Sequence, residues 1–312
     1  METAVLPAYI THADCARHEM GPHHPECPER LGAINDMLLT KGLLDYMHPY
    51  YAPLATPEQL AHAHSSRYVA ELMDASPAEG YHRVDPDTEM NPFTVRAALR
   101  AAGAVVQATD LVVSGEAPSA FCCVRPPGHH AERAAAMGFC FFNNVAVGIR
   151  HALTVHGIQR VALIDFDVHH GNGSEDIFQG DERVLMCSIF ETGIYPFCGD
   201  SPTSPNMVNV GLPSRSGSEA FRAAVTNRWL PALDVFAPEL IYISAGFDGH
   251  REDDMGNLGL VDADYAWVTQ QIMAVARRHC KGRVISCLEG GYALNPLARS
   301  VAAHVKVLIG AD

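Results

Sequence analysis

Short apolar runs recur along the chain and alternate with longer segments of helical character. Six runs rich in Val, Ile and Leu lack polar alternation, as parallel strands buried on both faces do: residues 5–10, 120–124, 160–166, 184–189, 240–244 and 283–288. The helical segments are residues 94–111, 143–156, 218–236, 262–279 and 295–308. This order predicts one doubly wound α/β domain over residues 1–312, with a central, mostly parallel sheet and helices on both faces.

Local signals refine the ends of these helices. Gly157 is an expected C-cap, and Ser218 and Asp262 are expected N-caps. Pro231 predicts a kink or a break inside the segment 218–236. The residues before position 90 are less regular, and we expect their His-, Pro- and Glu-rich loops to frame a site.

Polar or titratable residues follow four of the predicted strands directly. The most informative stretch is DFDVHHGNG at 165–173, which follows the apolar run 161–164. The other three are RPPGHH at 125–130, SAGFD at 244–248 and EGGY at 289–292. Ligands bind outside the carboxyl ends of the strands in open α/β sheets. We therefore expect the four clusters to contribute to one site.

Alternate residues of the first cluster suit a metal ion. In extended chain, Asp165, Asp167 and His169 point the same way, whereas His170 turns away and is expected to pack or to support the site. Asp167, His169 and Asp248 would provide three protein ligands and leave an open position for water and substrate, as in catalytic zinc sites. An unrelated ion-pair network is the alternative interpretation of these three residues.

The other cluster residues suit metal-assisted hydrolysis of an amide or ester. His129 and His130 follow a stiff turn and are candidates for the general base and the general acid. Asp165 is a candidate to fix the tautomer of one imidazole. Tyr292, on a Gly-Gly turn, is a candidate hydrogen-bond donor to an oxyanion.

Composition narrows the compartment and the partners. The chain is 48% hydrophobic and 19% charged, which is typical of a globular protein, and its net charge of -14 argues against direct nucleic-acid binding. No apolar run approaches the ~18 residues of a membrane span, and no secretion signal is visible at the N-terminus. Nine cysteines without a Cys-x-x-Cys pair indicate a reducing, cytoplasmic location. Cys122 and Cys123 are expected to be buried thiols.

At these residues the chain resembles the histone deacetylase family, including its acetylpolyamine and bacterial-type amidohydrolases, and the class II branch most closely. The matching stretches run in the family's order over nearly the whole chain: 24–31, 125–132, 138–144, 165–173, 244–248 and 288–292. The resemblance implies an arginase/deacetylase-type α/β fold with zinc on Asp167, His169 and Asp248. It also implies an amidohydrolase that removes an acetyl or other acyl group from acyl-lysine or a similar long-chain acyl-amine.

The resemblance assigns further catalytic roles. It implies His130 as the general base and then the acid, while His129, paired with Asp165, stays protonated and stabilises charge. Asn172 stands where some relatives have Asp behind the second histidine, which implies a weaker tuning of His130 without loss of activity. Tyr292 implies a working hydrolase, because members with His at this position are nearly inactive binding or scaffolding modules.

The family's narrow tunnel implies the residues that meet the substrate. Phe139, next to Gly138, and Tyr195 would be its two aromatic walls, and Tyr195 replaces the Phe of many relatives. Met255 is expected at the rim, where some polyamine enzymes have an acidic gatekeeper. Met255 therefore favours acyl-lysine, although the acidic stretch 252–254 keeps a polyamine substrate open.

The resemblance also implies a structural monovalent cation, K⁺ or Na⁺. Its ligands would be main-chain or side-chain oxygens of Asp165, Asp167, His169, Ser188 and Ile189. A second such site is implied around Phe178, Asp181 and Val184. The segment 191–209 is shorter than in class II relatives, so one wall of the site is either differently shaped or completed by a second subunit of a homo-oligomer.

Several residues are expected to have no direct catalytic role. Arg30 would form an ion pair that supports the site, and Cys140 would be a small buried side chain. The isolated histidines are expected at the surface or in loops: His12, His18, His62 and His64.

Three other functions remain alternatives. The chain could be an acetylpolyamine deacetylase, or a metal-dependent acyl-lysine binding protein with little turnover. A two-metal ureohydrolase of the arginase type is a third alternative, but it needs more bridging carboxylates than the sequence offers.

Overall fold

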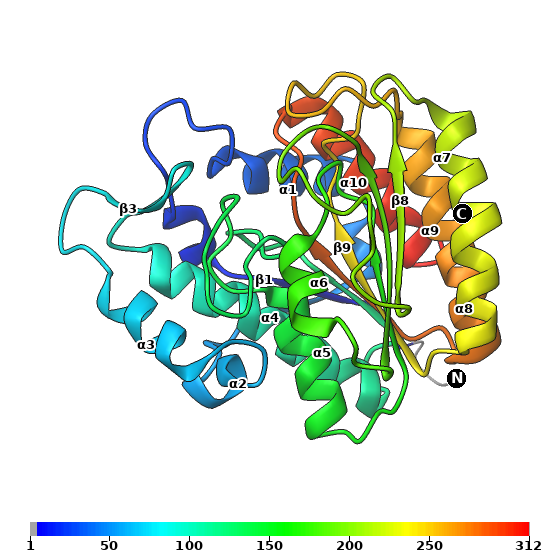
Figure 1. Ribbon diagram of the computed structural model, residues 1–312, viewed down its shortest axis with the longest axis horizontal. Coiled ribbons are helices and arrows are strands. Elements are labelled where there is room, and N and C mark those ends of the chain that lie inside the picture. The colour runs from blue at the N-terminus through cyan, green and yellow to red at the C-terminus, as the bar shows by residue number, and fades with distance from the viewer. Residues whose placement is uncertain (1–4, 312) are drawn as a thin grey trace.

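One eight-stranded sheet lies at the centre of the computed structural model, which describes residues 5–311 (Figure 1). The strand order is β2-β1-β5-β10-β9-β6-β7-β8, and every neighbouring pair is parallel. The strands are β1 (Ala8–Thr11), β2 (His48–Tyr51), β5 (Ser119–Cys122), β6 (Val161–Asp165), β7 (Val184–Glu191), β8 (Met207–Leu212), β9 (Leu240–Ala245) and β10 (Val284–Leu288). The predicted α/β class is confirmed.

Helices cover both faces of this sheet (Figure 1). Helices α4 (Thr94–Ser114) and α5 (Asn144–Thr154) lie on one side, and α9 (Asp262–His279) and α10 (Leu294–Leu308) lie on the other. Every residue of β5, β6, β7, β9 and β10 is buried. This double burial explains why these strands are continuous apolar runs in the sequence.

Smaller elements surround the sheet. Helix α1 (Glu29–Thr40) packs against α10, and a two-stranded hairpin of β3 (His82–Asp85) and β4 (Thr88–Met90) precedes α4. The remaining helices are α2 (Pro57–Ala61), α3 (Ser66–Asp74), α6 (Asn172–Phe178), α7 (Ser218–Ala224) and α8 (Leu230–Phe236). The edge strands β2 and β8 and the hairpin were not predicted, because they are short or only partly buried and lack a continuous apolar run.

All five predicted helices are present, but their caps differ from the prediction. Ser218 and Asp262 are the first helical residues rather than N-caps, and Gly217 and Val261 precede them. The side chain of Asp264 accepts a hydrogen bond from the Val261 amide at 3.1 Å. Asp264, inside the first turn of α9, therefore has the capping role that was predicted for Asp262.

Pro231, where a kink or a break was predicted, lies just after an irregular turn in a continuous helical stretch. A π-helical turn, Val225–Trp229, separates α7 from α8, and the proline lies in the first turn of α8, where no hydrogen bond from its nitrogen is needed. Helix α5 ends at Thr154 with Val155 as its C-cap, so Gly157 is not the cap. Gly157 has a φ of +67° and lies in the turn that leads to β6.

The sequence was expected to contain no segment long and apolar enough to span a membrane, but helix α4 meets this criterion by length and composition. Its most apolar window is 67% buried. It packs against β1, β5, β10 and α5, as the core helix of a folded domain does.

Two helical glycines offer a test of how tightly α4 is packed. A Cβ at Gly103 would lie 2.1 Å from the Pro53 carbonyl oxygen, whereas a Cβ at the exposed Gly32 of α1 would meet nothing within 4 Å. We expect Gly103→Ala to lower the free energy of unfolding by about 1–3 kcal/mol through overpacking. The matched Gly32→Ala should raise it by about 0.5–1 kcal/mol. Denaturant unfolding measures both, and an unchanged midpoint for Gly103→Ala would contradict the close packing.

Candidate active site

The four strands that precede the polar clusters are neighbours in the sheet. β5, β10, β9 and β6 occupy consecutive positions, although the chain visits them in a different order. Because all are parallel, their carboxyl ends open onto one edge. The four polar clusters therefore lie together, as predicted: residues 125–130, 289–292, 244–248 and 165–173.

Asp167, His169 and Asp248 converge at this edge, and all three are buried. The Nδ1 atom of His169 lies 3.1 Å from Asp167 Oδ1 and 3.2 Å from Asp248 Oδ2. The main-chain amides of Val168 and Gly290 bond the other carboxylate oxygens, Asp248 Oδ1 at 2.9 Å and Asp167 Oδ2 at 2.8 Å. Apart from the ion-pair contact with His169, Asp248 Oδ2 is buried without a hydrogen-bond partner among the described residues. The second oxygen of Asp248 is thus a buried acceptor that a metal ion would satisfy.

Two glycines allow the backbone to approach these carboxylates. A Cβ at Gly246 would lie 2.0 Å from Asp167 Oδ2, and a Cβ at Gly290 would lie 2.1 Å from Asp248 Oδ2. No larger residue fits at either position without moving a ligand. The glycines of the SAGFD and EGGY clusters are therefore part of the construction of the site.

The charge of the cluster also fits a divalent cation. Asp165, Asp167 and Asp248 are buried close together, and buried charges are costly unless they are paired. Burial, and then the negative charge of Asp167, raises the pKa of Asp248 to about 6. Two carboxylates and one imidazole are a donor set that suits zinc or a similar ion. The residues present therefore fit the predicted metal.

His129 lies between two carboxylates. Its Nδ1 atom is 3.0 Å from Asp165 Oδ2, and its Nε2 atom is 3.7 Å from Asp167 Oδ2. Burial alone would lower the pKa of His129, but the negative charges of Asp167 and Asp165 outweigh burial and raise this pKa to about 10. The imidazole is therefore cationic at neutral pH.

His130 has the opposite environment. Its Nδ1 atom lies 2.7 Å from Asn172 Oδ1, and the amide nitrogen of Asn172 donates to Glu132 Oε1 at 2.9 Å. The oxygen of Asn172 thus faces the ring, so Nδ1 carries the proton and Nε2 is left free to accept one. Burial, and then the positive charges of His129 and His169, lower the pKa of His130 well below its usual value. A neutral imidazole of this kind can act as a base.

A narrow cavity of about 120 Å³ leads to these residues. It is lined by Asp87, His130, Gly138, Phe139, His169, Tyr195, Met255 and Tyr292. The four residues predicted to meet the substrate are among them. Asp87 was not predicted, because it lies in the irregular N-terminal part, where no pattern connects it with the strand ends.

Tyr292 is fixed by its neighbours. Asp253 Oδ2 accepts hydrogen bonds from the amides of Tyr292 and Ala293 at 2.7 and 2.8 Å. The ring meets Phe139 edge-on at 5.8 Å between centroids, and the Arg30 guanidinium lies 5.0 Å from its centre. The ring of Tyr195 meets His130 edge-on at 5.1 Å.

The acidic stretch 252–254 does not line the cavity. Asp253 is buried beneath the Tyr292 turn, and Glu252 pairs with Arg299 at 3.0 Å. Asp254 is exposed but is not among the cavity residues. Among residues 252–255, only Met255 lines the cavity. Glu252 is held by Arg299, and Asp253 is held by the amide of Tyr292.

Glu289 holds the histidine turn in place. One of its oxygens accepts hydrogen bonds from the amides of Gly128 and His129 at 2.6 and 3.1 Å, and the other accepts one from the Ser244 hydroxyl at 3.2 Å. Burial raises the pKa of Glu289 to about 7. The sequence places Glu289 directly after an apolar strand, but it did not predict this supporting role.

A buried ion-pair network ties the N-terminal segment to the strand ends. Glu26 accepts from Arg30 at 2.9 Å and from Arg125 at 2.6 Å. Arg30 also donates to the carbonyls of Gly291, at 2.6 Å, and Glu289. The predicted supporting role of Arg30 agrees with this geometry.

Two of the isolated histidines, His18 and His64, lie in loops, as expected, but they are buried rather than at the surface. His18 bonds Thr94 Oγ1 at 2.8 Å, and His64 bonds the Glu132 carbonyl and the Asn143 amide, each at 2.9 Å. The irregular N-terminal loops pack beneath the site, which local sequence could not indicate.

The other expectations about single residues agree with the geometry. His170 bonds Glu175 at 2.6 Å and is not one of the three converging metal-binding candidates. Cys122, Cys123 and Cys140 are buried.

The residues predicted for monovalent cations lie beside the site. Asp165 pairs in register with Ser188 of the neighbouring strand, and Ile189 follows it. Around the second predicted position, the side-chain amide of Asn206 donates to the carbonyls of Phe178, Asp181 and Val184.

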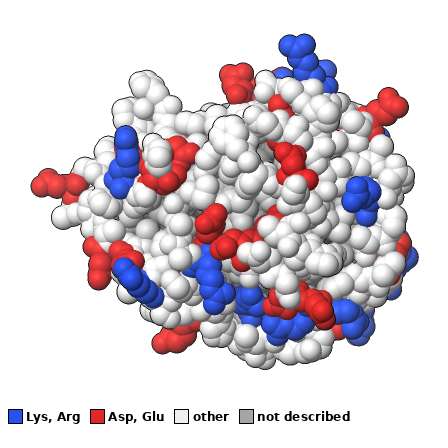
Figure 2. Space-filling model, viewed as in Figure 1, with Lys and Arg blue, Asp and Glu red and all other residues white. Residues whose placement is uncertain are grey.

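Charged side chains of both signs are mixed on the surface. On the face shown in Figure 2, the described Lys and Arg residues form separate groups among Asp and Glu rather than one broad basic area. The absence of direct nucleic-acid binding stays a prediction.

Comparison with known proteins shows which proteins this chain resembles. The family model of the histone deacetylase domain matches residues 24–308. The chain is 33% identical over 302 residues to a histone deacetylase-like amidohydrolase of Pseudomonas aeruginosa, covering 89% of this chain and 79% of that protein. It is 37% identical over 302 residues to the mouse polyamine deacetylase HDAC10, covering 91% of this chain and 45% of the mouse protein.

A solved structure agrees over nearly the full length. The crystal structure of the HDA15 HD domain superposes with a TM-score of 0.91 at 33% identity, covering 98% of this chain and 89% of that chain. The matched relatives differ widely in length, since this chain spans 20% of one of them and 100% of another.

Glu26 provides a test of the supporting network. We expect Glu26→Gln to lower the free energy of unfolding by about 3–5 kcal/mol, because two buried guanidinium groups lose their charge partner. Burial opposes ionisation, but Arg125 and Arg30 hold the pKa of Glu26 well below its usual range. Its stabilisation is therefore present at neutral pH and is lost as the pH falls through the folded-state value.

The matched control is Glu71→Gln, which removes another carboxylate paired four residues away, with the exposed Arg67. That change should cost at most about 0.5 kcal/mol. Denaturant unfolding at pH 7 compares the two variants, and equal losses would refute the supporting role of Glu26.

Proposed function

This chain belongs to the histone deacetylase family, and we propose that it is a zinc-dependent amidohydrolase that removes an acetyl group from acyl-lysine or a similar long-chain acyl-amine. One observation carries the proposal. Two carboxylates and an imidazole converge at the end of a narrow cavity, beside two histidines of which one meets a carboxylate and the other an amide oxygen.

The histidine pair divides the proton chemistry. When bound to Asp167, His169 and Asp248, zinc would polarise the amide carbonyl and activate a water molecule. His130 accepts the proton of that water at Nε2, because Asn172 keeps its other nitrogen protonated. His129 remains cationic and stabilises the negative charge that develops on the substrate. His130 then returns its proton to the departing nitrogen, which releases amine and acetate.

Tyr292 and the cavity walls position the substrate. The hydroxyl of Tyr292 donates a hydrogen bond to the oxyanion, and Asp253 holds the turn that presents it. Phe139 and Tyr195 flank the aliphatic chain, so only a narrow, extended acyl-amine reaches the site. A closed shape of this kind also limits the access of bulk water to the reacting groups.

Further expectations belong to the same proposal. A monovalent cation, K⁺ or Na⁺, would bind next to Asp165, Ser188 and Ile189 and stabilise the loop that carries the zinc ligands. Residues 1–312 would act as one catalytic domain. A reducing, cytoplasmic location is supported by nine cysteines that are all free.

Tyr292→Phe tests turnover against mere binding. We expect chelation to abolish hydrolysis of an acetyl-lysine peptide and added zinc to restore it. In the zinc-loaded enzyme, Tyr292→Phe should lower kcat by about 10²–10³-fold, because an oxyanion donor is lost. Tyr81→Phe removes the hydroxyl of an exposed tyrosine bonded to Glu19 and should leave kcat unchanged. A zinc-loaded protein that binds the peptide without hydrolysing it would instead be an acyl-lysine binding protein.

An acetylpolyamine deacetylase is the second candidate. Asp87 lines the cavity, where its negative charge would attract a second ammonium group, and two relatives, of mouse and human, are named polyamine deacetylase. Met255 favours the first candidate, because a thioether at the rim offers no charge to such a group. A two-metal ureohydrolase would require ligands for a second ion beside Asp167, and the potential ligand group found there among the described residues consists of Asp167, His169 and Asp248.

Substrate preference separates the two candidates. We expect a higher kcat/KM for an acetyl-lysine peptide than for acetylspermidine or acetylputrescine. Asp87→Asn should then affect the two substrate classes to a similar extent. A strong preference for the polyamines, lost selectively in Asp87→Asn, would assign the chain to the second candidate.

A further inference from the structure

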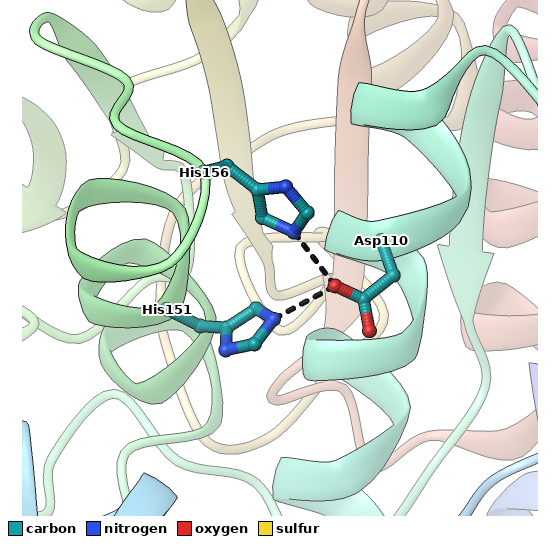
Figure 3. Close-up of side chains that lie close together, drawn as sticks. All are labelled: Asp110, His151 and His156. Atoms are coloured by element: carbon teal, nitrogen blue, oxygen red, sulfur yellow. Dashed lines mark hydrogen bonds and ion pairs between the residues drawn. The ribbon is translucent and has the colours of Figure 1, made fainter.

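A second group of potential metal ligands lies outside the candidate active site. Asp110 of α4, His151 of α5 and His156 of the following loop bring one ligand atom each to within 4.8 Å of one another (Figure 3). The Nε2 atoms of both imidazoles lie 2.7 Å from the same atom, Asp110 Oδ1. Figure 3 shows the rings entering from one side of the carboxylate, while its second oxygen points away.

This group is distant from the cavity. His156 follows α5 and precedes β6, so it lies near the amino end of a strand whose carboxyl end carries Asp165. The five residues of β6 span about 16 Å. Asp110, His151 and His156 therefore cannot touch a substrate in the cavity, and their role would be structural.

Two other carboxylates each meet a pair of guanidinium groups. Asp14 is met by Arg96 and Arg100, and Asp181 is met by Arg150 and Arg183. Guanidinium groups balance charge but do not bind metal ions. Among the described residues, Asp110 is met by imidazoles alone, and both present Nε2, a nitrogen that commonly binds zinc.

We propose that Asp110, His151 and His156 bind a zinc ion, with water in the fourth position. In a tetrahedral zinc site, neighbouring ligand atoms are about 3.3 Å apart, given zinc–ligand distances of about 2.0–2.1 Å. The observed 2.7 Å separations require only a small outward movement. Asp110 is 53% exposed at its side chain and His156 is 23% exposed, so this movement meets little resistance.

The ion would join three separate pieces of the chain. It would connect α4, the end of α5 and the turn at Gly157 that leads into β6, the strand preceding the predicted catalytic ligands. Without an ion, the carboxylate can share hydrogen bonds with both imidazoles, which is the competing interpretation of the same geometry. The two interpretations differ in whether zinc binds.

Zinc titration of the chelator-treated full chain tests the proposal. Isothermal titration calorimetry should show about one zinc ion more per chain for the wild type than for Asp110→Asn or His156→Gln. The matched control is His279→Gln, since His279 meets Asp234 at 2.9 Å beside Arg278 and lacks a second imidazole. That variant should bind as much zinc as the wild type.

The outcomes distinguish this site from the predicted catalytic one. Asp248→Asn should remove a different zinc equivalent, together with activity, whereas Asp110→Asn should leave the activity of the zinc-loaded enzyme unchanged. Thermal unfolding of the metal-free proteins checks that each variant folds, and added zinc should raise the Tm of Asp248→Asn but not of Asp248→Asn/Asp110→Asn. Equal zinc stoichiometry and affinity in the wild type, Asp110→Asn and His156→Gln would overturn the proposal.

Discussion

The burial of negative charge at the carboxyl ends of four neighbouring strands is the constraint on which the rest of this structure depends. Asp165, Asp167 and Asp248 are held together in a place where water cannot solvate them. Main-chain amides and a cationic His129 offset part of the cost, and the orphaned oxygen of Asp248 indicates where a metal ion would offset more. The glycines next to these acids are required because the backbone must approach them closely.

The side chains at these strand ends also give two adjacent histidines different environments. His129 and His130 are sequence neighbours on one turn, yet carboxylates surround the first and an amide oxygen faces the second. Each imidazole is therefore held in one protonation state before any substrate arrives. This division of roles depends on Asp165 and Asn172, which lie on a different strand end, and so on the pairing of strands distant in sequence.

Support for the site reaches into the irregular N-terminal segment. Glu26 and Arg30 connect that segment to the turn that carries Tyr292, and His64 packs beneath Asn143. These loops show no periodic pattern, but they bury polar groups with well-matched partners. Their contribution is to fix the position of the site, because a displaced Tyr292 or His130 could not meet the substrate correctly.

The sequence by itself determined the α/β class, the central strands and the clusters at their ends. Strands that are buried on both faces are continuous apolar runs, and the polar residues of the site follow these runs directly. It could not assign Glu289, Asp87 or the burial of His18, since these depend on contacts between segments distant in the chain. Tertiary structure alone decided that Asp253 supports Tyr292 and does not line the rim. It also brought His151 and His156 to Asp110, because hydrogen bonding and burial are set by the neighbours that folding provides.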